Sequence, residues 1–330
     1  MHKEHFGVLD GWRGISILLV LAAHLLPLGP KAWDLNVAAG LLGMVLFFNL
    51  SGFLITHFLL QRPNVPDFLM RRFFRILPLA WLYMGLMLYL TPASGATWSA
   101  HFLFYANYPP EPLVFTTSHL WSLCVEVHFY LGIALLVGFF GKRGLMVIPL
   151  LCIAFTLLRV GNNIHYAVIS HYRVDEILAG AWLALIYNSR PDAILRRFVS
   201  QGSVLVLAPL LLVACHPDSG AFNYLRPYLA AALIGVTMLD KTSPLTPLLQ
   251  QRLLVYIAGI SYALYVIHPF LMSTWLGSGE GLAKYAKRPL LFIVLFVMAH
   301  VSTFYYERPW IALGKKLSAK LKLGEMYGFK

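Results

Sequence analysis

The sequence predicts an all-α, polytopic integral membrane protein with about ten transmembrane helices and both termini in the cytoplasm. Hydrophobic residues make up 59% of the chain and charged residues only 12%, and the mean hydropathy is +0.69. Soluble domains are much less apolar. The apolar runs are long and rich in leucine, and they lack strict alternation. Because lipid offers no hydrogen-bond partners, each segment must satisfy its own backbone groups, which favours helices over a barrel.

Each helix is expected where an apolar run approaches a membrane span of about 20 residues. The expected helices cover residues 13–29, 38–60, 72–91, 119–140, 145–161, 174–188, 203–215, 228–240, 253–275 and 290–306. The first run contains His24 and lacks a small-residue cleavage site, so we expect a retained helix rather than a signal peptide. The runs at 203–215 and 228–240 are short, so these helices either extend further or are partly re-entrant.

The connecting segments predict the orientation, because Lys and Arg concentrate on one side. The basic residues of that side are Arg62, Arg71, Arg72, Arg75, Lys142, Arg143, Arg190, Arg196, Arg197 and the tail from Lys315 to Lys322. Those of the other side are Lys31, Arg173, Arg226 and the cluster from Lys284 to Arg288. The split of about 19 to 7 places both termini in the cytoplasm.

We therefore expect one membrane domain over residues 1–330, with a basic cytoplasmic tail at about 311–330 that lies along anionic lipid headgroups. The net charge of +12 is interpreted as orientation rather than as nucleic-acid binding, because no basic domain lies outside the spans. The histidines His24, His119 and His268 fall on different expected helices without a ligand spacing, so no metal is expected.

Arg13 and His24 are the first candidate site residues. They are eleven residues apart, which on an α-helix is a rotation of about 20° beyond three turns and a rise of about 16 Å. Both side chains therefore share a face, with Arg13 at the cytoplasmic mouth and His24 deep in the membrane. An ionisable residue at that depth is functional by default. A core histidine satisfied by a neighbouring helix is the alternative.

The second and third expected helices carry further candidates. Asn49 and Ser51 lie in an otherwise apolar span, and Gly52 beside them permits close helix contact. Packing explains Ser51 and Gly52 as well as function does, whereas Asn49 is harder to explain by packing. Arg72 and Arg75 share one face at the cytoplasmic start of the third helix, an arrangement that suits phosphate but that also sets topology.

The fourth expected helix has a polar stripe. Its members recur at spacings of three and four residues and are His119, Ser122, Glu126 and Tyr130. Inside a membrane such a stripe must face protein or water. A carboxylate at the depth of Glu126 needs a cation such as Arg13, or must be protonated.

Three other places carry polar groups near helix ends. The ninth helix offers His268 after Ser261 and Tyr265 at similar spacing. Arg173 and Asp175 open the sixth helix at the outer surface, where they either grip a hydrophilic acceptor or simply anchor the helix. The outer loop at 92–118 is either a substrate lid or an interfacial connector.

The sequence resembles the membrane acyltransferase-3 family over nearly its whole length. Its motifs are matched in order by Arg13 with His24, by Leu46-Phe47-Phe48-Asn49-Leu50-Ser51-Gly52-Phe53-Leu54-Ile55, by Arg72 with Arg75, by His119-Leu120-Trp121-Ser122-Leu123-Cys124-Val125-Glu126 with Phe129-Tyr130, by Ile260-Ser261-Tyr262-Ala263-Leu264-Tyr265 with His268-Pro269, and by Tyr305-Tyr306-Glu307-Arg308-Pro309. The chain departs from the family at Val45, Val127 and His128, where many members have an acidic residue, a second glutamate and a glutamine. These departures weaken any transfer of a specific acceptor.

This resemblance implies a bacterial inner-membrane O-acyltransferase. It would move an acyl group, most often acetyl, from cytoplasmic acyl-coenzyme A to a hydroxyl of an extracytoplasmic glycan or similar acceptor. Arg72 and Arg75 would bind the donor phosphates beside Arg13, and His24 would act as general base with Arg13 and Glu126. Residues expected to meet the substrates are Asn49, Ser51, Ser122, Tyr130, Arg173, Asp175 and His268.

Two alternatives stay open. A transient acyl-histidine at His24 is the rival catalytic route. A different class of function is a proton-coupled transporter or exporter of a glycan or other solute, with His24 and Glu126 as a proton relay. Such a transporter would often show repeated halves, which this sequence lacks. The chain also ends without the esterase-like domain that some members append, so we expect it to act alone or with a separate partner.

Overall fold

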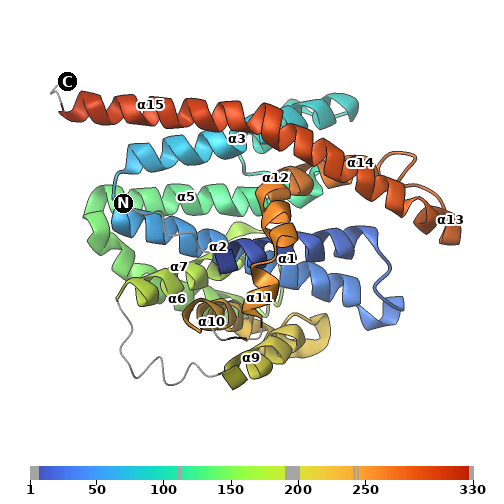
Figure 1. Ribbon diagram of the computed structural model, residues 1–330, viewed down its shortest axis with the longest axis horizontal. Helices are drawn as coiled ribbons and strands as arrows, with labels where there is room; N and C mark the ends of the chain where they lie inside the picture. The colour runs from blue at the N-terminus through green and yellow to red at the C-terminus, as the bar shows by residue number, and fades with distance from the viewer. Residues whose placement is uncertain (1–6, 110–112, 190–200, 241–242, 244, 327–330) are drawn as a thin grey trace. The chain divides into compact units, whose positions relative to one another are not determined.

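The computed structural model describes residues 7–109, 113–189, 201–240, 243 and 245–326 (Figure 1). Over these residues the chain is helical and contains no strand, which confirms the predicted all-α class. Arg190, Arg196 and Arg197, which contribute to the predicted orientation, lie outside the described residues, as does the end of the predicted tail.

Every expected apolar run forms a helix. The main helices are α1 (Gly7–Leu25), α2 (Leu35–Gln61), α3 (Val65–Leu90), α5 (Trp121–Phe140), α6 (Ile148–Gly161), α7 (Val174–Asn188), α9 (Gln201–Ala214), α10 (Arg226–Leu239), α12 (Arg252–Met272) and α14 (Arg288–Val301). The sequence did not predict the short helices α4 (Gly95–Phe102), α11 (Thr246–Leu249) and α13 (Gly281–Ala286), nor α15 (Arg308–Met326). A π-helix, η6 (Ser302–Glu307), joins α14 to α15.

Several helices can cross a membrane. In the described part of the chain, six segments are long and apolar enough, namely Gly7–Leu25, Leu35–Gln61, Val65–Leu90, Phe115–Gly161, Arg252–Met272 and Gly281–Lys320. The chain is therefore a multi-pass membrane protein. The count of ten spans stays a prediction, because helices such as α9 and α10 are only 14 residues long. The cytoplasmic location of both termini also stays a prediction.

Local features explain two of the helix bounds that differ from the predicted ones. Helix α1 ends at Leu25 rather than at residue 29, because Pro27 disfavours the helical conformation of the residue before it. His24 therefore lies in the last turn of α1 and not in the middle of a span. Helix α3 begins at Val65 rather than at residue 72, where the Asn64 side chain accepts a hydrogen bond from the Asp67 backbone N–H and Pro66 occupies the first turn.

The chain divides into two compact units. Unit 1 comprises the described residues of Met1–Phe58, Met146–Ala167 and His171–Ser261, and unit 2 those of Leu59–Leu145, Val168–Ser170 and Tyr262–Lys330. The prediction of one domain over 1–330 is not tested by this division.

Unit 1 is built on close contacts between helix backbones. The Trp12 indole N–H donates to Thr237 Oγ1 at 2.9 Å, which joins α1 to α10. A Cβ at Gly52 would overlap the Ile177 carbonyl, and a Cβ at Gly180 would overlap the Asn49 carbonyl. Glycine at both positions therefore lets α2 and α7 touch. This contact assigns Gly52 to packing, one of the two roles that the sequence left open.

Replacing Gly180 by alanine is expected to destabilise the protein by about 1–3 kcal/mol, because the added methyl group forces α7 away from the Asn49 carbonyl. The measurement is thermal unfolding of the purified protein in detergent. Gly259→Ala is the matched control, since a Cβ there meets nothing within 4 Å and alanine favours the helix. Equal stability of the two variants would contradict the contact.

Unit 2 contains a long pairing between α3 and α15 (Figure 1), which lie side by side. The Tyr306 hydroxyl donates to the Pro78 carbonyl at 3.2 Å, and the Ser318 hydroxyl donates to the Asp67 carboxylate. A Cβ at Gly314 would meet the Phe74 side chain. The C-terminal segment predicted as a tail is thus a helix packed on the protein through its first part.

Candidate active site

Arg13 and His24 both lie on α1 in unit 1, so the predicted shared face holds on one helix. Arg13 is partly buried and pairs with Asp10 at 3.7 Å. His24 is exposed at the protein surface, and its ring is hydrogen-bonded to the Val20 backbone carbonyl. A carbonyl accepts only from a ring N–H, so the other ring nitrogen of neutral His24 carries the basic lone pair.

The polar candidates of α2, Asn49 and Ser51, belong to the same unit as Arg13 and His24. Asn49 is fully buried, and its amide N–H donates to the Val45 carbonyl one turn earlier, at 3.0 Å. Its Oδ1 has no hydrogen-bond partner among the described residues. Such a group needs a water or a ligand. Ser51 is only partly buried.

Unit 2 brings the predicted arginines to the predicted carboxylate. The Tyr130 hydroxyl donates to Glu126 Oε1 at 2.6 Å, and the Arg72 guanidinium lies 6.0 Å from the centre of the Tyr130 ring. Arg72 is also within electrostatic range of Arg75 and Glu126. Because Tyr130 follows Glu126 by four residues, the helix itself aligns the two side chains.

A second carboxylate, Glu307, completes this group, and sequence reasoning missed it. It accepts hydrogen bonds from Ser302 at 3.2 Å and from Thr303 at 3.0 Å, and it lies within electrostatic range of Arg75. Glu307 ends the π-helix η6, a conformation frequent at functional sites. Its place in the closing motif was the available signal. The Arg72–Glu126 group is defined here as Arg72, Arg75, Glu126, Tyr130 and Glu307.

A second polar group in unit 2, the α5–α12 cluster, consists of His119, Ser122, Tyr265 and His268. The Tyr265 hydroxyl donates to the His119 carbonyl, so Ser122 is the donor in its 2.6 Å hydrogen bond with the Tyr265 oxygen. His268 is buried, its Nδ1–H donates to the Tyr265 carbonyl at 2.7 Å, and its ring lies 5.3 Å from that of His119. His119 lies in the 3-10 turn before α5 rather than on the helix.

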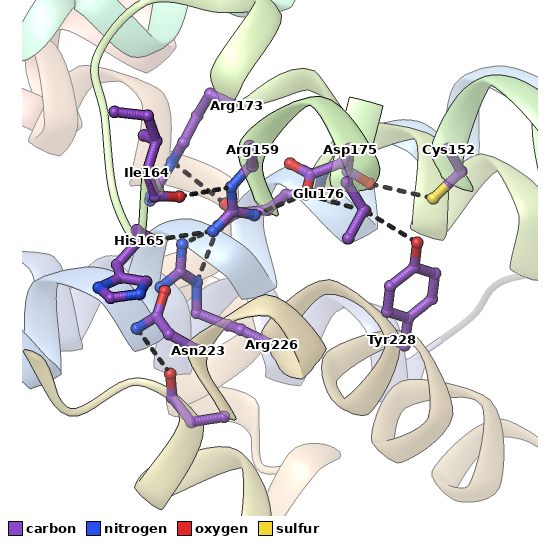
Figure 2. Close-up of polar contacts among 12 residues, drawn as sticks. Cys152, Arg159, Ile164, His165, Arg173, Asp175, Glu176, Asn223, Arg226 and Tyr228 are labelled. Atoms are coloured by element: carbon purple, nitrogen blue, oxygen red, sulfur yellow. Dashed lines mark hydrogen bonds and ion pairs between the residues drawn. The ribbon is translucent and has the colours of Figure 1, made fainter. Parts of the chain in front are cut away.

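Arg173 and Asp175 belong to a buried arginine–carboxylate cluster in unit 1, defined as Arg159, Arg173, Asp175, Glu176 and Arg226 (Figure 2). Arg159 pairs with Asp175 at 2.5 Å. Glu176 pairs with Arg226 at 2.8 Å and with Arg173 at 3.4 Å. The cluster joins the end of α6 to the starts of α7 and α10.

Sequence reasoning missed Arg159, Glu176 and Arg226. The signal was Arg159, a charged residue inside the apolar run at 145–161. Both predicted substrate residues of this cluster, Arg173 and Asp175, are at most 1% exposed. Among the described residues, no group of three or more His, Cys, Asp or Glu side chains can hold a metal ion.

Comparison with known proteins decides the family. The family profile that describes an acyltransferase domain of the acyltransferase-3 type matches residues 6–308, a range that includes every candidate site residue. This chain belongs to the acyltransferase-3 family. The family resemblance predicted from the sequence is therefore confirmed.

The curated relatives of this acyltransferase-3 chain are distant. O-acetyltransferase OatA of Staphylococcus aureus (strain NCTC 8325 / PS 47) is 24% identical, over 79% of this chain and 49% of the relative. Peptidoglycan O-acetyltransferase OatA of Listeria monocytogenes serovar 1/2a is also 24% identical, over 81% of this chain and 49% of the relative. The chain thus spans about half the length of the curated relatives it matches. No solved structure matches it.

Proposed function

We propose that this chain is a membrane O-acyltransferase that moves an acetyl group from cytoplasmic acyl-coenzyme A to a hydroxyl of an extracytoplasmic glycan. The observation that carries the proposal is the family match over residues 6–308, which contains the arginines and carboxylates of the Arg72–Glu126 group. The names of the relatives, which are O-acetyltransferases, support acetyl as the group transferred. Peptidoglycan, named for one of them, is the model for the acceptor class.

The donor would be held through its phosphates. Arg72 and Arg75 follow each other by three residues on α3 and so share a side of the helix. Guanidinium groups bind phosphate with charge-assisted hydrogen bonds. Glu126 lies within electrostatic range of Arg72, and Glu307 within range of Arg75. Tyr130, Ser302 and Thr303 orient the two carboxylates through hydrogen bonds, so we propose that the carboxylates position the guanidinium groups.

His24 would be the general base. Its lone-pair nitrogen takes the proton of the acceptor hydroxyl as the hydroxyl oxygen attacks the thioester carbonyl. The carbon–sulfur bond then breaks, and the imidazolium returns the proton to the leaving thiolate. Arg13 lies about 16 Å from His24 along α1, toward the start of the helix, and we propose that it guides the donor there. An acyl-histidine route remains the rival.

The acceptor would meet neutral polar groups. Ser122 and His268 are the predicted substrate residues of the α5–α12 cluster, which offers hydroxyl and imidazole groups suited to sugar hydroxyls. Asn49 would accept a hydrogen bond through its buried Oδ1. We also propose Ser51 and Tyr130 as substrate-binding residues. Arg173 and Asp175 are buried in ion pairs, so we propose that they act on the substrate by holding α7 in position.

The test is acetyl-coenzyme A hydrolysis by the purified protein in neutral detergent, which needs no acceptor. The Arg72→Ala, Arg75→Ala double variant is expected to raise KM for the donor about a hundredfold or more, because each of the two lost charge-assisted contacts weakens binding by about 1.5–3 kcal/mol. Arg143→Ala, which removes an exposed arginine of the same unit, is the control.

Two results would contradict the proposal. One is a folded, monodisperse wild-type protein that binds no acyl-coenzyme A. The other is an unchanged KM in the double arginine variant, which would remove the donor site from α3. Saturable solute uptake into proteoliposomes without acyl-coenzyme A would favour the transporter instead.

A further inference from the structure

Helix α15 lies beyond the family domain, since the family match ends at residue 308. It follows α14 and η6 without a break, and the helix from Arg288 to Met326 would be about 58 Å long. A hydrocarbon core is about 30 Å thick. Part of this helix therefore extends out of the membrane, and its lysines place that part at the basic, cytoplasmic side.

The contacts between α15 and α3 show which side chains of the two helices lie on the same side of this helix pair. Tyr306 contacts Pro78, the ring centres of Trp310 and Phe74 are 6.3 Å apart, and Ser318 contacts Asp67. Residue numbers rise on one helix as they fall on the other, so the two helices pack antiparallel.

On α3 the phosphate-binding candidates lie to one side of this contact. An α-helix turns about 100° per residue. Viewed along α3, Arg75 lies about 40° and Arg72 about 100° from Arg71 in one direction of rotation. Phe74 lies about 60° from Arg71 in the opposite direction, the second sense. The residues of α3 that contact α15 are Asp67, Phe74 and Pro78, and they lie about 20–60° from Arg71 in that second sense. Arg75 therefore lies about 80° and Arg72 about 140° to one side of the middle of this contact face.

The rotation angles about the axis of α15 place its lysines on different sides of the helix. Lys315 lies about 60° from Ser318 in one sense and Trp310 about 80° in the other, whereas Lys316 and Lys320 lie about 160° away on the far side. Viewed from one end, two antiparallel right-handed helices turn in opposite senses. Ser318, Gly314 and Trp310 face α3, and Lys315 lies about 100° from Gly314. The side of α15 that carries Lys315 therefore matches the side of α3 that carries Arg75.

Lys315 is also level with the arginines. It follows Gly314, whose close neighbour is Phe74, and Phe74 lies between Arg72 and Arg75 in the sequence. The Lys315 side chain is exposed, so a ligand on this flank can reach it.

We propose that Lys315 of α15 adds a cation to the donor-binding surface of α3 and binds a phosphate of acyl-coenzyme A. This inference rests on the proposed function. Acyl-coenzyme A carries a diphosphate and a phosphate monoester, more negative charge than Arg72 and Arg75 can balance beside Glu126 and Glu307. Arg71 cannot fill this role, because Asp67 already neutralises it. A lysine provides a point charge that follows a flexible phosphate.

The test compares KM for acetyl-coenzyme A with KM for S-acetyl-pantetheine, which lacks phosphate, in neutral detergent without lipid. Lys315→Ala is expected to raise KM for acetyl-coenzyme A about threefold to tenfold, as expected for one exposed charge-assisted contact. KM for S-acetyl-pantetheine and kcat for both donors should stay unchanged, and Lys315→Arg should restore binding. Lys316→Ala and Lys320→Ala, exposed lysines on the far side, should behave as wild type.

The outcomes separate this inference from the proposed function. If the wild type turns over no acyl donor, the proposed function fails. If the wild type is active but Lys315→Ala matches Lys316→Ala, only the role of Lys315 fails. An equal rise in KM for S-acetyl-pantetheine, or a defect that appears only when anionic lipid vesicles are added, would also overturn it, the latter in favour of a headgroup contact.

Discussion

Replacing His24 by alanine is expected to lower acyl transfer by about 10²–10⁴-fold, the usual contribution of a general base. The loss should appear in kcat rather than in KM for the donor, because the proposed phosphate contacts lie on α3. His24 is exposed and its ring contacts Val20 on its own helix. The substitution should therefore leave the fold intact. The measurement is transfer from acetyl-coenzyme A to a soluble glycan fragment, beside thermal unfolding in detergent.

The control for His24 is His300→Ala, which removes a partly buried histidine from α14. His300→Ala should keep wild-type kcat. His24→Gln keeps a hydrogen bond to Val20 but supplies no base, so it should be as inactive as alanine. Full activity in a folded His24→Ala variant would end the catalytic assignment.

Replacing Asp175 by alanine is expected to destabilise the protein by about 3–5 kcal/mol, because it leaves a buried arginine without its partner. Both side chains of the Arg159–Asp175 pair are fully buried, and their atoms are 2.5 Å apart. The Asp175 carboxylate also accepts a hydrogen bond from Thr156 at 3.2 Å. Equilibrium unfolding in detergent measures the loss.

Two variants make this prediction specific. Asp10→Ala breaks the partly exposed pair with Arg13 and should cost no more than about 1 kcal/mol. The Arg159→Met, Asp175→Leu double variant removes both buried charges and should recover much of the stability. A folded Asp175→Asn variant with normal stability and weakened acceptor binding would instead favour the direct acceptor contact that the sequence predicts.

The sequence anticipates the helices of this protein better than their ends. Apolar runs locate α1 and α3, but prolines and caps set their bounds, so His24 lies in the last turn of α1. The sequence did not predict helix α15, because its residues form a charged, amphipathic segment rather than an apolar one. It is stabilised instead by its contacts with α3, such as that of Ser318 with Asp67.

The amino-acid pattern alone predicts the membrane class, the places of the main helices and the neighbours along one helix, such as Glu126 and Tyr130. These features depend on composition and on helical spacing, which a linear pattern contains. The pairs of residues on different helices become visible only in the folded structure. Ser122 meets Tyr265 across 143 residues, and Arg226 meets Glu176 across 50. Such partners are chosen by helix packing, because a buried charge is stable only where another helix supplies its counter-charge.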